Sequence, residues 1–141
     1  MDTLLYHYEV NGDNFSIAGE NSSKVKKILR QLGFNPDIIR KVAIAMYEAE
    51  INMVIHANGG YIDAEISPEK IKITLCDNGP GIPDIEKAMQ EGYSTATNTV
   101  RELGFGAGMG LPNIKKYSDE LNIKTEIGKG TTLEIIVNVN N

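Results

Sequence analysis

The chain has 141 residues, 41% of them hydrophobic, and carries a formal net charge of −5 with a pI near 5.0. This predicts one packed domain over residues 1–141, and the acidic balance disfavours nucleic acid or an anionic membrane as a partner. No stretch approaches the roughly 18 apolar residues of a membrane span, and no signal-peptide pattern is present, so we expect a cytoplasmic protein without a membrane partner.

The N-terminal part of the chain predicts a hairpin followed by a helix. Residues 4–10 and 15–19 have strand character, and residues 11–14 supply the Asn, Gly and Asp that tight turns need. Residues 21–23, Asn-Ser-Ser, then offer caps for an amphipathic helix that Gly33 ends.

A second, longer helix is predicted from Pro36 to about residue 58. It is apolar nearly all round, yet Glu48 and Asn52 lie one turn apart on one face. A carboxylate that is buried there needs a partner, which makes this face a candidate site. Glu50 projects roughly opposite Glu48, and we expect it at the surface.

A second hairpin follows, with strands over residues 61–66 and 71–75 and a turn between them. Asp77 comes at the end of its second strand. Cys76 is the single cysteine; we interpret it as a small buried residue in a reducing compartment, without a disulfide or a cysteine-rich metal site.

The C-terminal half predicts a long connection over residues 78–104, of the kind that usually covers a site, and then regular structure. The expected elements are a short helix at 85–90, a helix at 109–121 and a closing hairpin with strands at 123–127 and 131–139. Strands grouped in hairpins with helices between them predict an α+β two-layer sandwich, in which one mixed, mostly antiparallel sheet carries helices on one face.

Three acidic and glycine-rich patterns occur in one order along these elements. They are Glu48 with Asn52, Asp77 with Gly79 and Gly81, and a glycine at every second position from Gly104 through Gly106 and Gly108 to Gly110. Each pattern alone is weak: Glu48 alone would more often be solvated, and Asp77 alone would more often cap a turn. The spacing is neither a P-loop nor a GxGxxG fingerprint, so phosphates would be held by backbone N–H groups before the helix at 109.

Together these patterns resemble the GHKL ATPase superfamily, or Bergerat fold, over about residues 22–137. Glu48 and Asn52 match its N box, and the two glycine patterns match its two glycine boxes. Gly130-Thr131 matches its late Gly-Thr element. Four matched elements in the right order are far more specific than any one of them.

Within this superfamily the short chain resembles the anti-sigma-factor serine kinases, and residues 104–116 resemble their switch-kinase branch. A complete sensor kinase needs a phosphoacceptor histidine, but His7 falls in a predicted strand and His56 in the long helix. The resemblance implies a serine/threonine kinase that uses ATP and Mg²⁺ and phosphorylates a STAS-domain protein.

The resemblance also implies residue roles. Asp77 would accept a hydrogen bond from the adenine amine, supported by Thr131 through water, while Asn52 would hold Mg²⁺ and Glu48 would be the general base. The remaining nucleotide-binding candidates are Gly79, Gly81, Gly104, Gly106, Gly108, Met109, Gly110 and Leu111.

Two alternatives remain open from the sequence. One is an ATP-gated binding module that sequesters a sigma factor or another regulator without essential catalysis, and the other is a detached sensor-kinase ATPase domain. Arg101 is a weak candidate for a γ-phosphate contact, and Lys115 and Lys116 are more typical of a solvated helix face. The oligomeric state, monomer or homodimer, stays open.

Overall fold

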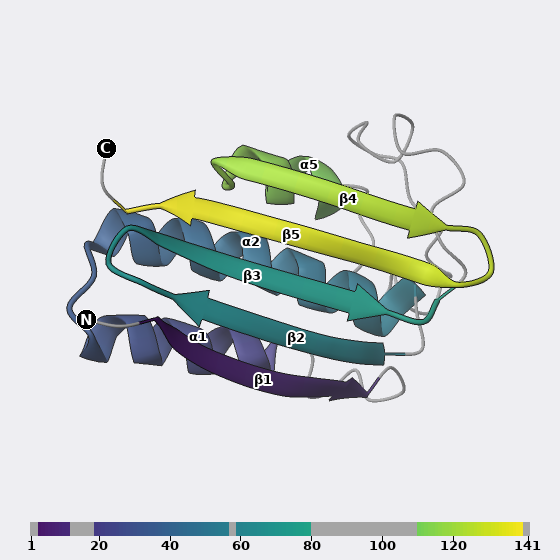
Figure 1. Cartoon of the computed structure of the whole chain (residues 1–141), viewed down its shortest axis with the longest axis horizontal. Helices are drawn as coiled ribbons and strands as arrows, with labels where there is room; N and C mark the ends of the chain where they lie inside the picture. The colour runs from purple at the N-terminus through teal and green to yellow at the C-terminus, as the bar shows by residue number, and fades with distance from the viewer. Residues whose placement is uncertain (1–2, 12–18, 57–58, 80–109, 140–141) are drawn as a thin grey trace, which may run out of the picture.

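The computed structural model describes residues 3–11, 19–56, 59–79 and 110–139, and these form two layers (Figure 1). One layer is an antiparallel sheet in the order β1-β2-β3-β5-β4, and described helices cover one of its faces. The strands are β1 (Leu4–Asn11), β2 (Gly59–Ile66), β3 (Lys70–Asp77), β4 (Glu120–Glu126) and β5 (Gly130–Asn138); the helices are α1 (Glu20–Gln31), α2 (Pro36–His56) and α5 (Gly110–Lys116). The α+β sandwich predicted from the sequence is confirmed.

The core lies between the sheet and the helices. Alternate residues of β3, such as Ile71 and Ile73, are fully buried beneath α2, whose Val42 and Met46 are also fully buried. Strand alternation therefore places one side chain in two against the helical layer, and the others form the second face of the sheet. Within the described residues, no helix is both long and apolar enough to cross a membrane.

Helix α1 begins differently from the prediction. Its N-cap is Gly19, with φ of 89°, and the predicted cap residues Asn21 and Ser22 lie inside the first turn, where both are buried. A Cβ added at Gly19 would lie 2.5 Å from a ring carbon of Tyr47, so glycine permits both the left-handed backbone and the close approach of α2. Gly19 provides no side-chain oxygen to cap the helix.

Glu50 of α2 supplies the missing acceptor, and the prediction that it lies at the surface is wrong. Only 2% of Glu50 is exposed, and its carboxylate accepts hydrogen bonds from Ser22 N at 3.0 Å and Asn21 N at 3.2 Å. The first N–H groups of a helix have no partner within the helix and lie at its positive end, so a carboxylate is well suited to them. Helix α1 is thus capped by a side chain of its neighbour.

The boundary between α5 and β4 also differs from the prediction, which placed Leu121 in a helix. Leu121 is a strand residue, because the chain leaves the helix at Lys116 and Asp119 N donates to Ile136 O at 2.9 Å. The Asp119 carboxylate then accepts from Lys41 Nζ and from Asn138 N, both at 2.6 Å. Partial burial by itself would raise the pKa of Asp119, but these two donors hold it below its ordinary value. Pairing with β5 therefore overrides the helical pattern.

Several predicted features lie outside the described residues. These are most of the predicted strand at 15–19, the turn at 12–14 and the short helix at 85–90. Among the described strands, β1 pairs with β2. Gly59 and Gly60 are the first two residues of β2. Cys76 is a free, half-buried thiol on β3, more accessible than predicted.

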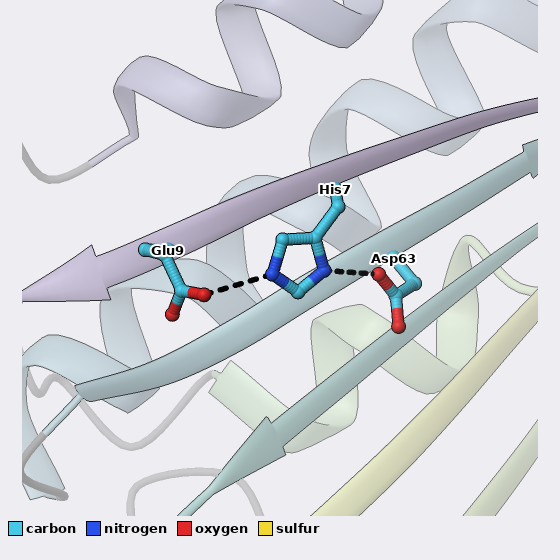
Figure 2. Close-up of polar contacts among 3 residues, drawn as sticks. All are labelled: His7, Glu9 and Asp63. Atoms are coloured by element: carbon cyan, nitrogen blue, oxygen red, sulfur yellow. Dashed lines mark hydrogen bonds and ion pairs between the residues drawn. The ribbon is translucent and has the colours of Figure 1, made fainter.

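His7 occupies the second face of the sheet, between two carboxylates (Figure 2). Its Nε2 lies 2.8 Å from Glu9 Oε1 on the same strand, and its Nδ1 lies 2.6 Å from Asp63 Oδ1 on β2. The cluster is exposed, and the contact with Glu9, followed by that with Asp63, raises the pKa of His7 above 6.5. Both ring nitrogens can donate only in the protonated imidazolium, and this explains why contacts with two carboxylates raise the pKa of His7.

We expect an NMR titration to give His7 a pKa above 6.5, and the Glu9→Gln and Asp63→Asn variants to bring it back toward that value. Any stabilisation from this cluster is present below pH 6.5 and is lost as the pH rises through the raised pKa, because the folded state then releases its extra proton. A titration unchanged in both variants would contradict the assignment. His7→Gln identifies the resonance, since the chain has two histidines.

Candidate functional site

Asp77 lies at the C-terminal end of β3 and joins two neighbouring segments. Its Oδ1 accepts hydrogen bonds from Gly79 N at 2.9 Å and from Thr131 N at 3.1 Å. Gly79 and Thr131 are both buried, with 7% of Thr131 exposed. Two backbone donors among the described residues therefore hold one carboxylate oxygen, Oδ1.

Gly130 allows β5 to start directly against the end of β3. It has φ of 131°, and a Cβ added there would lie 2.1 Å from the backbone oxygen of Asp77. Any other residue would push the two strands apart and would weaken the bond from Thr131 N to Asp77. The close approach to Asp77 thus explains why the predicted Gly-Thr element begins with a glycine.

Glu48 faces α5 from the middle of α2. Burial raises the pKa of this half-buried carboxyl, and a hydrogen bond with the side chain of Asn113 on α5 partly opposes the rise. Asn52, one helical turn further along α2, is also half-buried. A carboxyl with a raised pKa, next to a half-buried amide, is suited to accept a proton beside a bound ion.

Three of the elements that carry these residues meet at one end of the sheet (Figure 1). The C-terminal ends of β3 and α2 and the first residue of β5 lie at that end. Leu111, near the start of α5, is 8% exposed and packs in the core. Gly110 begins α5, whereas Gly81, Gly104, Gly106, Gly108 and Met109 lie outside the described residues. Residues 3–11, 19–56, 59–79 and 110–139 contain no cluster of three or more His, Cys, Asp and Glu side chains that could hold a metal.

Two contacts at the site were missed from the sequence. One is the bond between Asn113 and Glu48, and the other joins the hydroxyl groups of Thr125 and Thr131, whose oxygens lie 2.9 Å apart. Thr125 pairs with Thr131 across the closing hairpin. The predicted hairpin could have suggested this pair if its register had been known, but nothing in the sequence connects Asn113 with Glu48.

Comparison with known proteins gives one family and several named relatives. Residues 19–137 match the model of the histidine kinase-like ATPase domain. The serine/threonine-protein kinase RsbT of Bacillus subtilis strain 168 is 32% identical over 115 residues, covering 79% of this chain and 80% of the relative. An anti-sigma F factor of Thermoanaerobacter sp. strain X514 is 34% identical over 134 residues, covering 86% and 88%.

Solved structures share the fold at lower identity. A chain from the SiaB–SiaC complex of Pseudomonas aeruginosa superposes with a TM-score of 0.60 at 14% identity, covering 94% of this chain and 88% of that one. The RsbU and RsbW domains of a Mycobacterium tuberculosis protein give a TM-score of 0.58 at 14% identity; the match covers 94% of this chain but 32% of that one. At this identity the likeness supports the two-layer architecture alone.

Proposed function

Because this chain belongs to the histidine kinase-like ATPase domain family, we propose that it binds ATP at Asp77 and acts as a serine/threonine protein kinase of the anti-sigma-factor group. We take residues 1–141 as a single domain. Its substrate would be a serine or threonine of a STAS-domain partner protein. The names of two relatives, a serine/threonine-protein kinase and an anti-sigma F factor, support this reading.

The observation that carries the proposal is the state of the Asp77 carboxylate. Both described donors, the N–H groups of Gly79 and Thr131, use Oδ1, so Oδ2 would accept from the exocyclic amine of adenine. Guanine presents a carbonyl oxygen at the same position, which a carboxylate repels. Asp77 would therefore select ATP over GTP by the chemistry of one acceptor atom.

Asn52 is the residue that would hold Mg²⁺, and it fits the ion. Mg²⁺ prefers oxygen ligands, keeps several waters and usually takes few protein ligands beside phosphate oxygens, so one half-buried amide oxygen suffices. When bound, the ion would neutralise negative charge on the phosphate oxygens.

Glu48 would act as the general base of the transfer. The hydroxyl oxygen of the partner's serine attacks the γ-phosphorus, the bond from that phosphorus to the β–γ bridging oxygen breaks, and the hydroxyl proton passes to the Glu48 carboxylate. The products are phosphoserine and ADP. Burial of Glu48 favours this role, because a raised pKa makes the carboxylate a stronger base at neutral pH.

Titration of Mg-ATP into wild-type protein and into Asp77→Asn tests the nucleotide site. The amide keeps the shape, and its oxygen can still accept from both backbone N–H groups, but an NH₂ group then replaces the charged acceptor for adenine, so affinity should fall about 10- to 100-fold. Isothermal calorimetry measures the change. Asp63→Asn, an exposed carboxylate on β2 that contacts His7, is the matched control and should bind as wild type. Equal affinity of Asp77→Asn and wild type, or no wild-type binding at millimolar ATP, would contradict the proposal.

A further inference from the structure

A glycine lies against the end of β3 on each side. Gly60 is the second residue of β2 and pairs with Asp77, the last residue of β3. A Cβ added at Gly60 would overlap the backbone oxygen of Cys76 and would lie 2.8 Å from Asp77 Cα. On the other side, a Cβ added at Gly130 of β5 would overlap the backbone oxygen of Asp77. Both neighbouring strands therefore reach the backbone of β3 at the residue proposed to bind adenine.

The space around Gly60 sets it apart from glycines that serve a turn. Gly33 has φ of 82°, and no atom of a non-adjacent described residue lies within 4 Å of a Cβ added there. The backbone conformation alone explains a glycine at that position. At Gly60 the nearest atoms belong to the backbone of β3, and no side chain can rotate away to make room. Any larger residue must therefore move β2 or the end of β3.

The contact of Gly60 also relates Asp77 to the helix that carries the other proposed site residues. Asn52 lies near the C-terminal end of α2, and β2 is the next element along the chain. Asp77 is held from β5 through its carboxylate, by the bond from Thr131 N at 3.1 Å, and it is approached from β2 at its Cα. The position of Asp77 thus depends on both neighbouring strands.

We propose that Gly60 is a positioning residue of the nucleotide site, which acts through Asp77 by letting β2 and β5 hold the end of β3 from both sides. The inference rests on the proposed function, because it takes Asp77 as the acceptor of the adenine amine. A hydrogen bond weakens steeply when its geometry departs from the ideal, so a small displacement of Asp77 lowers the affinity for the base. In Gly60→Ala either β2 withdraws from Asp77 or Asp77 moves with the end of β3.

The experiment measures the dissociation constant of Mg-ATP by calorimetry for wild type, Gly60→Ala, Asp77→Asn and the double variant, each checked for its fold by circular dichroism. Gly60→Ala should weaken binding about tenfold in the wild-type background. In the Asp77→Asn background it should weaken binding less than about threefold, because the charged acceptor that Gly60 positions is already lost. A purely structural role of Gly60 would cost the same factor in both backgrounds.

Gly33→Ala is the matched control, because it makes the same substitution at a glycine where an added Cβ has open space. It strains the backbone without displacing Asp77, so it should bind Mg-ATP as wild type does. A loss of affinity in Gly33→Ala equal to that in Gly60→Ala would overturn the inference, since any strained replacement of a glycine would then have the same effect.

A second measurement covers the case in which Gly60→Ala does not fold. Titration of Mg-ATP into isotope-labelled wild-type protein should shift the backbone amide resonance of Gly60 and leave that of Gly33 in place. At saturating Mg-ATP, the shift of Gly60 should be much smaller in Asp77→Asn. A Gly60 resonance that does not respond in wild type, or that responds equally in Asp77→Asn, would overturn the inference.

The outcomes separate this inference from the proposed function. Wild-type protein that binds Mg-ATP, with Gly60→Ala binding equally well or losing the same factor in both backgrounds, overturns the role of Gly60 and leaves the kinase proposal standing. Wild-type protein that does not bind Mg-ATP overturns the proposed function, and the inference with it.

Discussion

Glu48→Gln should lower the rate of phosphoryl transfer about 100- to 10,000-fold while leaving the affinity for Mg-ATP nearly unchanged. Glutamine keeps the size of the side chain and can still hydrogen-bond with Asn113, but it cannot accept the serine proton. The change therefore removes the base and preserves the packing between α2 and α5. The measurement is single-turnover transfer from γ-labelled ATP to a STAS-domain substrate, recovered as acid-stable phosphoserine.

The rate of phosphoryl transfer should also change with pH in one defined direction. Because burial raises the pKa of Glu48 above 4.5, the carboxylate takes up a proton earlier than an exposed glutamate as the pH falls. The wild-type rate should therefore decline as the pH drops through this raised pKa, and the residual rate of Glu48→Gln should lack that decline. Asn113→Ala removes the opposing hydrogen bond and should move the decline to higher pH.

Glu126→Gln is the matched control for Glu48→Gln, since Glu126 is exposed on β4 and pairs with Lys129. It should transfer phosphate at the wild-type rate. A Glu48→Gln variant that binds ATP and also transfers at that rate would remove the general base from the mechanism. If such a variant still bound its partner in a nucleotide-dependent manner, the ATP-gated binding module would become the better explanation.

The parts of the site that depend on nearby residues were predictable from the sequence. Asp77 ends β3 and Gly130-Thr131 opens β5, so their places at strand ends were predictable, and the proposed role of Asp77 toward adenine came from the family resemblance. The prediction that Glu48 and Asn52 lie on one face of a helix required only the helical period. The hairpins formed by β2 with β3 and by β4 with β5 follow from the same local patterns.

The contacts between distant segments could not be predicted in this way. A helical projection separates Glu50 from Glu48, but it does not say that Glu50 faces Asn21 and Ser22, which are 28 to 29 residues earlier in the chain. The apolar spacing over residues 109–121 predicts a helix through Leu121, but pairing of Leu121 with Ile135 on β5 places it in a strand. In each case a tertiary partner outweighed a correct local pattern.

Glu50→Ala should give the largest loss of stability among single changes outside the core, about 2–4 kcal/mol in the free energy of unfolding. The change leaves two buried N–H groups, those of Asn21 and Ser22, without the acceptor they use, and it leaves space beneath α1. Urea unfolding followed by circular dichroism measures the difference. Glu20→Ala, an exposed residue of the same helix end that pairs with Lys24, is the control and should change stability by less than about 1 kcal/mol.

The pH dependence separates the cap from simple packing. Burial raises the pKa of Glu50, and the bonds from the backbone N–H groups of Ser22 and Asn21 oppose the rise without cancelling it. Glu9, Glu20 and Lys24 are the other charged groups that line the hollow next to Glu50. Since the folded state holds its proton more tightly than the unfolded state, the contribution of Glu50 to stability falls as the pH rises from about 4.5 through the raised pKa.

Glu50→Gln removes this dependence but keeps the volume of the side chain. Its amide can accept from one N–H of α1 while its NH₂ group faces the other, so the variant should be less stable than wild type at every pH. The deficit should be larger near pH 5 than at pH 7, because only the wild-type protein gains stability from proton uptake at Glu50. A deficit that is constant between these two pH values would show that the pKa of Glu50 is not raised in the folded state.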